Sequence, residues 1–259
     1  MKPILLSFGN INVYSYGFMI AVGILAAVYY MDRRAPKYGM DGDSAFSMAL
    51  CAMISGIAGA KLLYLLMVLP QLISDPSSIT MYLRSGFVVF GGIICGILSC
   101  LLLARYKKWD FYKYFDLFMP SIALAQGFGR IGCFMAGCCY GKHTDSFFSV
   151  TFPENAYSLA PAGTPLIPTQ LISSGLDFIN CIVLTMYARH STRDGKVGGL
   201  YLILYSIGRF FLEFLRGDDR GAIGMLSTSQ FISLLSLTVG LIIFLVPFNN
   251  KSQVKGETI

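Results

Sequence analysis

The sequence predicts an all-α integral membrane protein, a seven-transmembrane helix bundle with its N-terminus outside the cell and its C-terminus inside. Three observations predict this fold class: the composition, seven long apolar stretches, and the distribution of basic residues between them. Of the 259 residues 55% are hydrophobic and only 13% are charged, and the mean hydropathy is +0.63. Because such helices must hide their polar groups against one another, we expect residues 1–259 to form a single membrane domain.

The apolar stretches are each close to the roughly 20 residues that a helix needs to cross the hydrocarbon core, and tilt absorbs the scatter in their lengths. The first stretch lacks the short apolar core and small-residue cleavage site of a signal peptide, so we expect it to stay as an anchor. The seven stretches run from Tyr16 to Met31, Ser44 to Leu69, Gly86 to Leu103, Phe115 to Cys138, Thr169 to Ala188, Gly198 to Leu215 and Met225 to Pro247.

Basic residues in the connecting segments predict the orientation, because short loops rich in Lys and Arg stay in the cytoplasm. The first, third and fifth loops and the C-terminal tail hold twelve basic residues, against five on the opposite side. Insertion topology and anionic membrane lipids therefore explain the net charge of +6, and we expect no nucleic acid partner. The twelve are Arg33, Arg34, Lys37, Arg105, Lys107, Lys108, Lys113, Arg189, Arg193, Lys196, Lys251 and Lys255; the five are Lys2, Arg84, Lys142, Arg216 and Arg220.

The loops differ in length, and the longest one falls on the predicted outer side. Segment 139–168 is rich in proline and contains the β-compatible run FFSVTF at 147–152. A loop of this length is typically functional or disordered, and we expect a small folded outer-face cap, an insertion at 139–168 between the fourth and fifth helices. Segment 70–84 is expected to form a second, interfacial arm.

Seven cysteines are present, mostly inside apolar stretches, where a thiol behaves as a small hydrophobe. The exception is the group Cys133, Cys138 and Cys139 at the outer end of the fourth stretch. Its spacing fits no standard zinc pattern, so small-residue packing is the first interpretation and a disulfide the second. We expect no metal and no cofactor.

Polar residues inside apolar stretches are costly and mark functional sites. In the sixth stretch, Tyr201, Tyr205, Arg209, Glu213 and Arg216 follow one another at helical spacing, which predicts that they share one face near the outer surface. Arg130 in the fourth stretch has no acidic neighbour in sequence, and a guanidinium in that setting suits a phosphate group.

Plainer explanations exist for several of these residues. Arg209 and Glu213 could form an intrahelical ion pair that hides both charges, and Lys61 could extend its ammonium to the outer interface. Asp116 and Asp177 lie away from the outer group along their stretches, and we expect both to be helix-packing partners.

Several motifs together resemble one family. The run GRIGCFMAGCCYG at 129–141 resembles the signature of the prolipoprotein diacylglyceryl transferases, whose common form reads G-R-x-G-N-F-x-N-G-E-x-x-G. Other parts resemble further motifs of the family in the same order, and these matches span nearly the whole chain. They are YSYGFMIAVG for the first-helix motif, GAKLLYLL for the second, FGGIICG for the third, IPTQL for H-P-x-Q-L, and LYSIGRFFLEFLRGDD for Y-x-x-x-R-F-x-x-E-x-x-R.

The resemblance implies a transferase of the bacterial plasma membrane that acts at the outer leaflet. It implies two partners, phosphatidylglycerol and the lipobox peptides of preprolipoproteins, with transfer of the diacylglyceryl group to a cysteine thiol and release of glycerol phosphate. Carried over residue by residue, Arg130 and Arg209 match the essential arginines, and Tyr16 and Glu213 are further catalytic candidates. The substrate-binding candidates are Tyr205, Arg216, Gly141, Gln170 and Lys61.

The chain also departs from the family pattern. Phe90 and Ile167 stand where the family often has histidine, and Cys133, Ala136 and Cys138 replace the two Asn and the Glu of the signature. Several candidate proton acceptors are thus missing, and the general base stays unassigned. Two alternatives remain open: a paralogue that acts on another acceptor, and a membrane protein that binds or transports an anionic lipid without chemistry.

Overall fold

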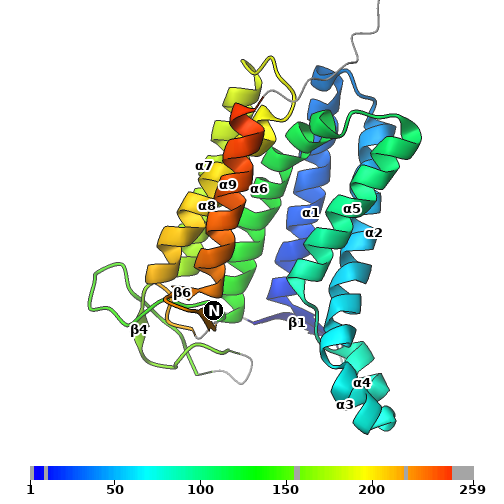
Figure 1. Cartoon of the computed structure of the whole chain (residues 1–259). Helices are drawn as coiled ribbons and strands as arrows, with labels where there is room; N and C mark the ends of the chain where they lie inside the picture. Colours follow the sequence, from blue (N-terminus) through cyan, green and yellow to red (C-terminus); the bar gives the residue numbers. More distant parts are fainter. Residues whose placement is uncertain (1–2, 9–10, 155–157, 219–220, 247–259) are drawn as a thin grey trace, which may run out of the picture. The chain divides into compact units, whose positions relative to one another are not determined.

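The computed structural model describes residues 3–8, 11–154, 158–218 and 221–246. Within them, seven helices have 18 or more residues, and six of these are long and apolar enough to cross a membrane. The remaining long helix, α6, carries Asp116, Gln126 and Arg130 along its length, which lowers its hydropathy. The chain is therefore a mostly helical, multi-pass membrane protein (Figure 1). The seven are α1 Ser15–Arg34, α2 Gly42–Met67, α5 Val89–Lys107, α6 Phe111–Ala136, α7 Thr169–Ala188, α8 Lys196–Phe214 and α9 Thr228–Leu245.

Turn residues set several helix boundaries away from the ends of the apolar stretches. Helix α5 begins at Val89 because Gly86 adopts a φ of 72°, a left-handed conformation that does not continue a helix. Helix α6 ends at Ala136, followed by Gly137 with a φ of 71°, so Cys138 lies outside it. Met225 also lies outside α9, whose first turn is capped by Ser227. Pro247, Lys2, Arg220, Lys251 and Lys255 fall outside the described residues.

The chain divides into two compact units, the first comprising Met1–Tyr30 with Phe115–Ile259 and the second Met31–Tyr114. In the first unit, α8 packs along α9 and against α7. Its core contains Met119 and Ala123 of α6, Leu184 of α7 and Tyr201 of α8. The close approach of α8 and α9 needs glycine, since a Cβ on Gly240 would lie 2.8 Å from the Leu202 Cβ.

Asp116 fixes the start of α8 from the neighbouring helix α6. Its buried carboxylate accepts hydrogen bonds from the backbone N–H groups of Gly195 and Gly198, both at 2.8 Å. These groups at a helix N-terminus have no partner within their own helix, so an acidic side chain satisfies them. The expected packing role of Asp116 is confirmed.

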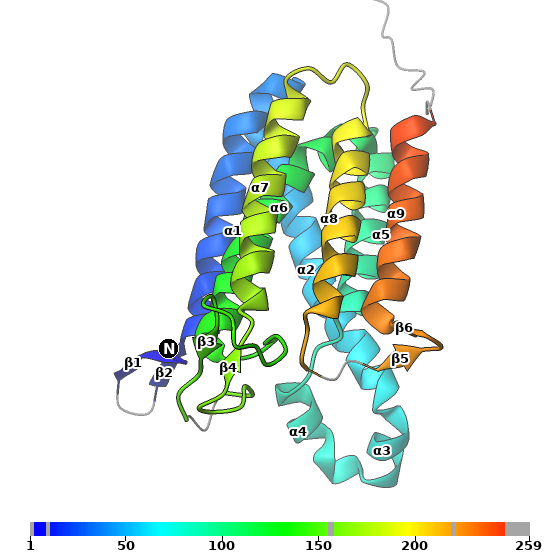
Figure 2. The same cartoon turned by 90° about the vertical axis from the view of Figure 1, so that its left-hand side faces the viewer.

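Three short hairpins lie at one end of the first unit, where α1, α7 and α9 begin and where α6 and α8 end (Figures 1 and 2). Strand β1 Ile4–Phe8 pairs with β2 Ile11–Tyr14, β3 Val150–Thr151 with β4 Pro165–Leu166, and β5 Ala222–Ile223 with β6 Leu226–Ser227, all antiparallel. This gathering at one end agrees with the alternation of the helices along the chain.

The described parts of segment 139–168 pack around a small core. Phe152, Ala160 and Leu166 are buried together and pack against Phe134 and Tyr140. Of the run at 147–152, only Val150 and Thr151 form a strand, while Phe147 and Phe148 are exposed. The role of this segment as an outer-face cap stays a prediction, as do the seven-span count and the N-out orientation.

In the second unit, α2 packs along α5 at a point where only glycine fits. A Cβ on Gly59 would meet the Cys95 Cβ at 2.4 Å, so the two helix backbones approach closely there. The predicted arm follows α2 as three short helices, α3 Leu69–Ser74, η2 Pro76–Ser78 and α4 Ile79–Arg84. A further short helix, η1 Ala35–Tyr38, precedes α2.

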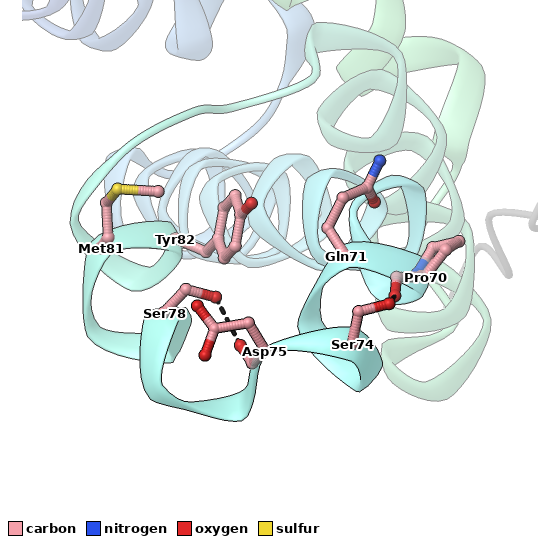
Figure 3. Close-up of a pocket in the computed structure, with 7 residues that line it drawn as sticks. All are labelled: Pro70, Gln71, Ser74, Asp75, Ser78, Met81 and Tyr82. Atoms are coloured by element: carbon pink, nitrogen blue, oxygen red, sulfur yellow. Dashed lines mark hydrogen bonds between the residues drawn. The ribbon is translucent and has the colours of Figure 1, made fainter.

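The arm holds an open pocket of about 430 Å³ (Figure 3). Serine hydroxyls brace its turns, since Ser78 donates to the Asp75 carbonyl at 2.6 Å and Ser74 donates to the Pro70 carbonyl at 2.9 Å. The pocket is lined by Pro70, Gln71, Ser74, Asp75, Ser78, Met81 and Tyr82.

Candidate functional site

The hairpin end of the first unit carries most of the predicted site residues. On α8, Arg209 Nη2 lies 3.0 Å from Glu213 Oε2, and both side chains are largely buried. The intrahelical ion pair between Arg209 and Glu213, which the sequence analysis offered as the plainer explanation, is therefore present. Arg209 Nη2 also donates a hydrogen bond at 2.9 Å to the hydroxyl of Ser229 on α9. Glu213 Oε2, although close to the guanidinium, accepts no well-aligned hydrogen bond within the described part of the chain.

Arg130 is a cation in the interior of the helix bundle. In the described residues, its partly buried guanidinium has no hydrogen bond or ion pair, although Tyr205 and Asp177 lie within electrostatic range. Such a group is costly to keep in a low-dielectric interior unless an anion balances it. Arg130 is thus available to a ligand with a negative charge.

Asp177 connects the two arginines electrostatically. Its side chain is 3% exposed, its Oδ2 has no hydrogen-bond partner among the described residues, and both Arg130 and Arg209 act on its charge. With a rise of 1.5 Å per residue, Asp177 lies about 12 Å inside the start of α7, and the arginines about 8 to 9 Å inside the ends of α8 and α6. The three charged groups therefore lie at similar depths.

Sequence reasoning assigned Asp177 only a packing role. Its distance along the helix from the outer polar group hid its relation to the arginines. One signal was available, because an aspartate in the middle of an apolar stretch is a functional candidate by default.

Two tyrosines on α8 continue the polar face toward the interior. Tyr201 and Tyr205 stack with ring centroids 5.7 Å apart, and the Tyr201 hydroxyl donates to Gln126 Oε1 on α6 at 2.8 Å. Tyr16, at the start of α1, is 44% exposed and lies within electrostatic range of Arg130 and of Cys133, Cys138 and Cys139.

Arg216 does not share the helical face predicted for it. Helix α8 ends at Phe214, and Arg216 instead forms an antiparallel β-bridge with Gly141. The Arg216 guanidinium donates two hydrogen bonds to the Asp218 carboxylate, each 2.6 Å long, and these hold the turn after α8. Burial opposes the charge of Arg216, but the hydrogen bonds to Asp218 and to Cys139 outweigh it and raise the pKa of Arg216.

Gly141 lies in a space that excludes a side chain. A Cβ at this position would lie 2.5 Å from the Ile167 carbonyl oxygen and 2.9 Å from that of Leu215. The match of Gly141 to the family signature thus coincides with a close backbone crossing.

Helix α7 begins by holding the turn that follows α6. Gln170 Nε2 donates to the Cys138 carbonyl at 2.7 Å, and the Thr169 hydroxyl donates to the Cys139 carbonyl at 2.9 Å. Gln170 Oε1 is buried without a hydrogen bond from the described residues. One end of this side chain therefore fixes the turn while the other keeps a free acceptor.

The turn held by Gln170 and Thr169 brings three thiols together. The Sγ atoms of Cys133, Cys138 and Cys139 all lie within 4.8 Å of one another. The neighbouring thiols of Cys133 and Cys138, and then Arg216, lower the pKa of Cys139, while the Cys138 thiol donates a hydrogen bond to the Cys133 carbonyl at 3.7 Å. No disulfide joins these three cysteines in the structure, which differs from the second interpretation of the sequence.

Lys61 belongs to the second unit. Its ammonium donates to the carbonyls of Tyr82 and Ser85, each at 2.7 Å, and to that of Gly86 at 3.3 Å. It also lies 4.9 Å from the ring centroid of Phe87. Within its unit, Lys61 fixes the loop between α4 and α5.

The fold and this arrangement define a multi-pass membrane protein with cationic side chains gathered inside its helix bundle. A model of the prolipoprotein diacylglyceryl transferase family matches residues 3–246, and the chain belongs to this family.

Curated relatives support the same assignment along the full length. A phosphatidylglycerol–prolipoprotein diacylglyceryl transferase of Clostridium tetani is 48% identical over 94% of this chain and 97% of its own. The enzyme of that name numbered 2 from Clostridium perfringens is 44% identical over 100% of this chain and 99% of its own. A third, from Clostridium kluyveri, is 34% identical over 94% and 96%.

Proposed function

We propose that this chain is a phosphatidylglycerol–prolipoprotein diacylglyceryl transferase of the bacterial plasma membrane, with its site toward the outer leaflet. It transfers the diacylglyceryl group of phosphatidylglycerol to the thiol of the lipobox cysteine, which creates a thioether and releases glycerol phosphate. The family match over residues 3–246 and the names of the relatives support the reaction class.

The observation that carries the proposal is the guanidinium of Arg130, which has no hydrogen bond or ion pair within the described residues. The leaving group of the reaction is a phosphate, and its negative charge grows as the carbon–oxygen bond breaks. A planar guanidinium binds two phosphate oxygens at once, so Arg130 and Arg209 together act as a phosphate clamp. Arg209 is already oriented for this by Glu213 and Ser229.

Asp177 offsets the repulsion between the two arginines before the lipid binds. A single buried carboxylate that both guanidinium groups act on lowers the cost of keeping two positive charges in the bundle. Asp177 is thus a positioning residue. Tyr205 and Tyr16 both lie within electrostatic range of Arg130. They supply phenol groups at the edge of the same region.

The folded loop at the hairpin end serves the acceptor peptide. Gly141, Arg216 and Gln170 are linked there by backbone pairing and by contacts to the turn after α6. Because Arg216 is held by Asp218, it shapes this loop and presents backbone groups to the peptide. Lys61, in the second unit, is kept as a substrate-binding candidate on the family resemblance of its motif GAKLLYLL.

The test is a reconstituted reaction. Purified protein in phosphatidylglycerol vesicles is offered a synthetic lipobox peptide, and both glycerol phosphate release and the mass of the peptide are measured. We expect release to match the diacylglyceryl gain of the peptide, and a peptide with serine in place of the lipobox cysteine to give neither. Release without peptide modification would favour a paralogue with another acceptor, and lipid binding without release would favour the transport or binding alternative.

A further inference from the structure

Cys133, Cys138 and Cys139, at the end of α6 and in the turn that follows, form a compact group of soft ligands that has no role in the phosphate clamp. Cys133 is buried on the last turn of α6, and Cys138 and Cys139 are half-buried in the turn that follows. Their sulfur atoms all lie within 4.8 Å of one another. Cys139 has a φ of 62°, a left-handed conformation that non-glycine residues seldom adopt. The surrounding hydrogen bonds therefore hold this turn against a local conformational cost.

We propose that Cys133, Cys138 and Cys139 bind one Zn²⁺ ion and leave its fourth position open for the thiol of the acceptor peptide. Thiolates bind zinc at about 2.3 Å, which places their sulfur atoms about 4 Å apart around a common ion. The observed group needs only a small contraction to reach this geometry. Three protein ligands with one open position are typical of zinc sites that act on a substrate.

The charges beside the cysteines fit a bound ion of this kind. Three thiolates around Zn²⁺ carry a net charge of −1. Arg216 hydrogen-bonds to Cys139, and Arg130 lies within electrostatic range of Cys133 and Cys139. Arg216, which is also paired with Asp218, and Arg130 therefore place positive charge beside the negative site.

Access to the ion is also provided. Cys138 and Cys139 are each partly exposed to solvent, while Cys133 is 8% exposed. The Cys138 and Cys139 carbonyls are tied back to Gln170 and Thr169. The turn is therefore fixed through its backbone from the α7 side.

The site explains how the chain manages without the missing proton acceptors, and this part of the inference rests on the proposed function. The lipobox thiol binds zinc and loses its proton to water, because a coordinating thiol is deprotonated at neutral pH. The sulfur then attacks the glyceryl carbon that carries the phosphate. The carbon–oxygen bond breaks, its electron pair leaves with glycerol phosphate, and the new thioether is a weak ligand that departs. Phe90, Ile167 and Cys138, at positions where the family often has His, His and Glu, are then no obstacle.

Metal binding is tested first, without lipid. Reduced protein in detergent is titrated with Zn²⁺ against a chromophoric chelator and with Co²⁺ by visible absorption. We expect one ion per chain and a thiolate-to-cobalt charge-transfer band. Cys133→Ser, Cys138→Ser and Cys139→Ser should each weaken binding at least tenfold, while Cys51→Ser, half-buried on α2, should bind as the wild type does. Absence of binding by the reduced wild type would overturn the proposal.

The open position is tested with the acceptor. Adding a lipobox peptide should strengthen the charge-transfer band of the Co²⁺ protein, because a fourth sulfur joins the ion, and the serine peptide should not. Removal of metal should lower lipid transfer about a hundredfold, with recovery on addition of Zn²⁺. Full transfer by metal-free protein would remove this inference and leave the proposed function intact. Metal binding with a peptide response but no lipid transfer would leave the metal site and remove the transferase.

Discussion

Gly141 and Arg216 form an antiparallel β-bridge that joins the segment after α6 to the segment after α8. Backbone hydrogen bonds flank it on either side, with Lys142 N donating to the Leu215 carbonyl at 2.9 Å and Gly217 N donating to the Tyr140 carbonyl at 3.2 Å. This crossing connects the signature at 129–141 to the end of the sixth apolar stretch. The helices that carry Arg130 and Arg209 are therefore linked at their ends.

Replacing Gly141 by alanine should destabilise this crossing. The new Cβ would press on two backbone carbonyl oxygens, which cannot move as a flexible side chain can. We expect a loss of about 1 to 3 kcal/mol, measured by thermal unfolding in detergent. Gly175→Ala is the matched control, because a Cβ there meets nothing within 4 Å. Equal stability of the two variants would contradict the tight crossing.

Arg209→Lys and Arg130→Lys should each lower lipid transfer by about a hundredfold or more while the protein stays folded. Lysine keeps the charge but loses the planar fork that binds two phosphate oxygens. Initial rates in the vesicle assay give the result, with expression and membrane insertion checked for each variant. If Arg209 only neutralised Glu213, its lysine variant would keep most of its activity, and near wild-type transfer by both variants would end the phosphate clamp.

The two buried aspartates should behave differently when each is changed to asparagine. Asp177→Asn removes the charge that both arginines act on, so we expect transfer to fall about tenfold, a larger effect on transfer than that of Asp116→Asn, together with some loss of thermal stability. Asp116→Asn weakens the cap of α8, so we expect a loss of about 1 to 3 kcal/mol of stability with a smaller effect on transfer. Measuring both quantities for both variants separates the roles, and the reverse pattern would refute them.

The orientation predicts which lysines an external reagent reaches. In intact cells, a membrane-impermeant amine reagent should modify Lys142, while Lys107 and Lys108 should react only after lysis. Peptide mapping by mass spectrometry gives the extent of modification at each position. Modification of both groups from the outside would refute the seven-span topology.

The sequence alone determined that the protein is a multi-pass membrane protein. It also identified most of the polar residues of the candidate site. Hydropathy is a local property, so the apolar stretches could be recognised without knowing what each helix packs against. Helical spacing likewise predicted that Arg209 and Glu213 meet, because neighbours four residues apart lie on one face. Their 3.0 Å ion pair confirms this prediction.

Only the tertiary structure decided what lies opposite each of these groups. The spacing of Cys133, Cys138 and Cys139 fits no standard zinc pattern, yet the left-handed turn after α6 gathers their sulfur atoms. Helical periodicity placed Arg216 on α8, where hydrogen bonds to Asp218 instead end the helix and pair Arg216 with Gly141. Packing between helices brings Asp177 within electrostatic range of both Arg130 and Arg209. Such relationships depend on contacts between segments far apart in the chain, and a local pattern carries no information about them.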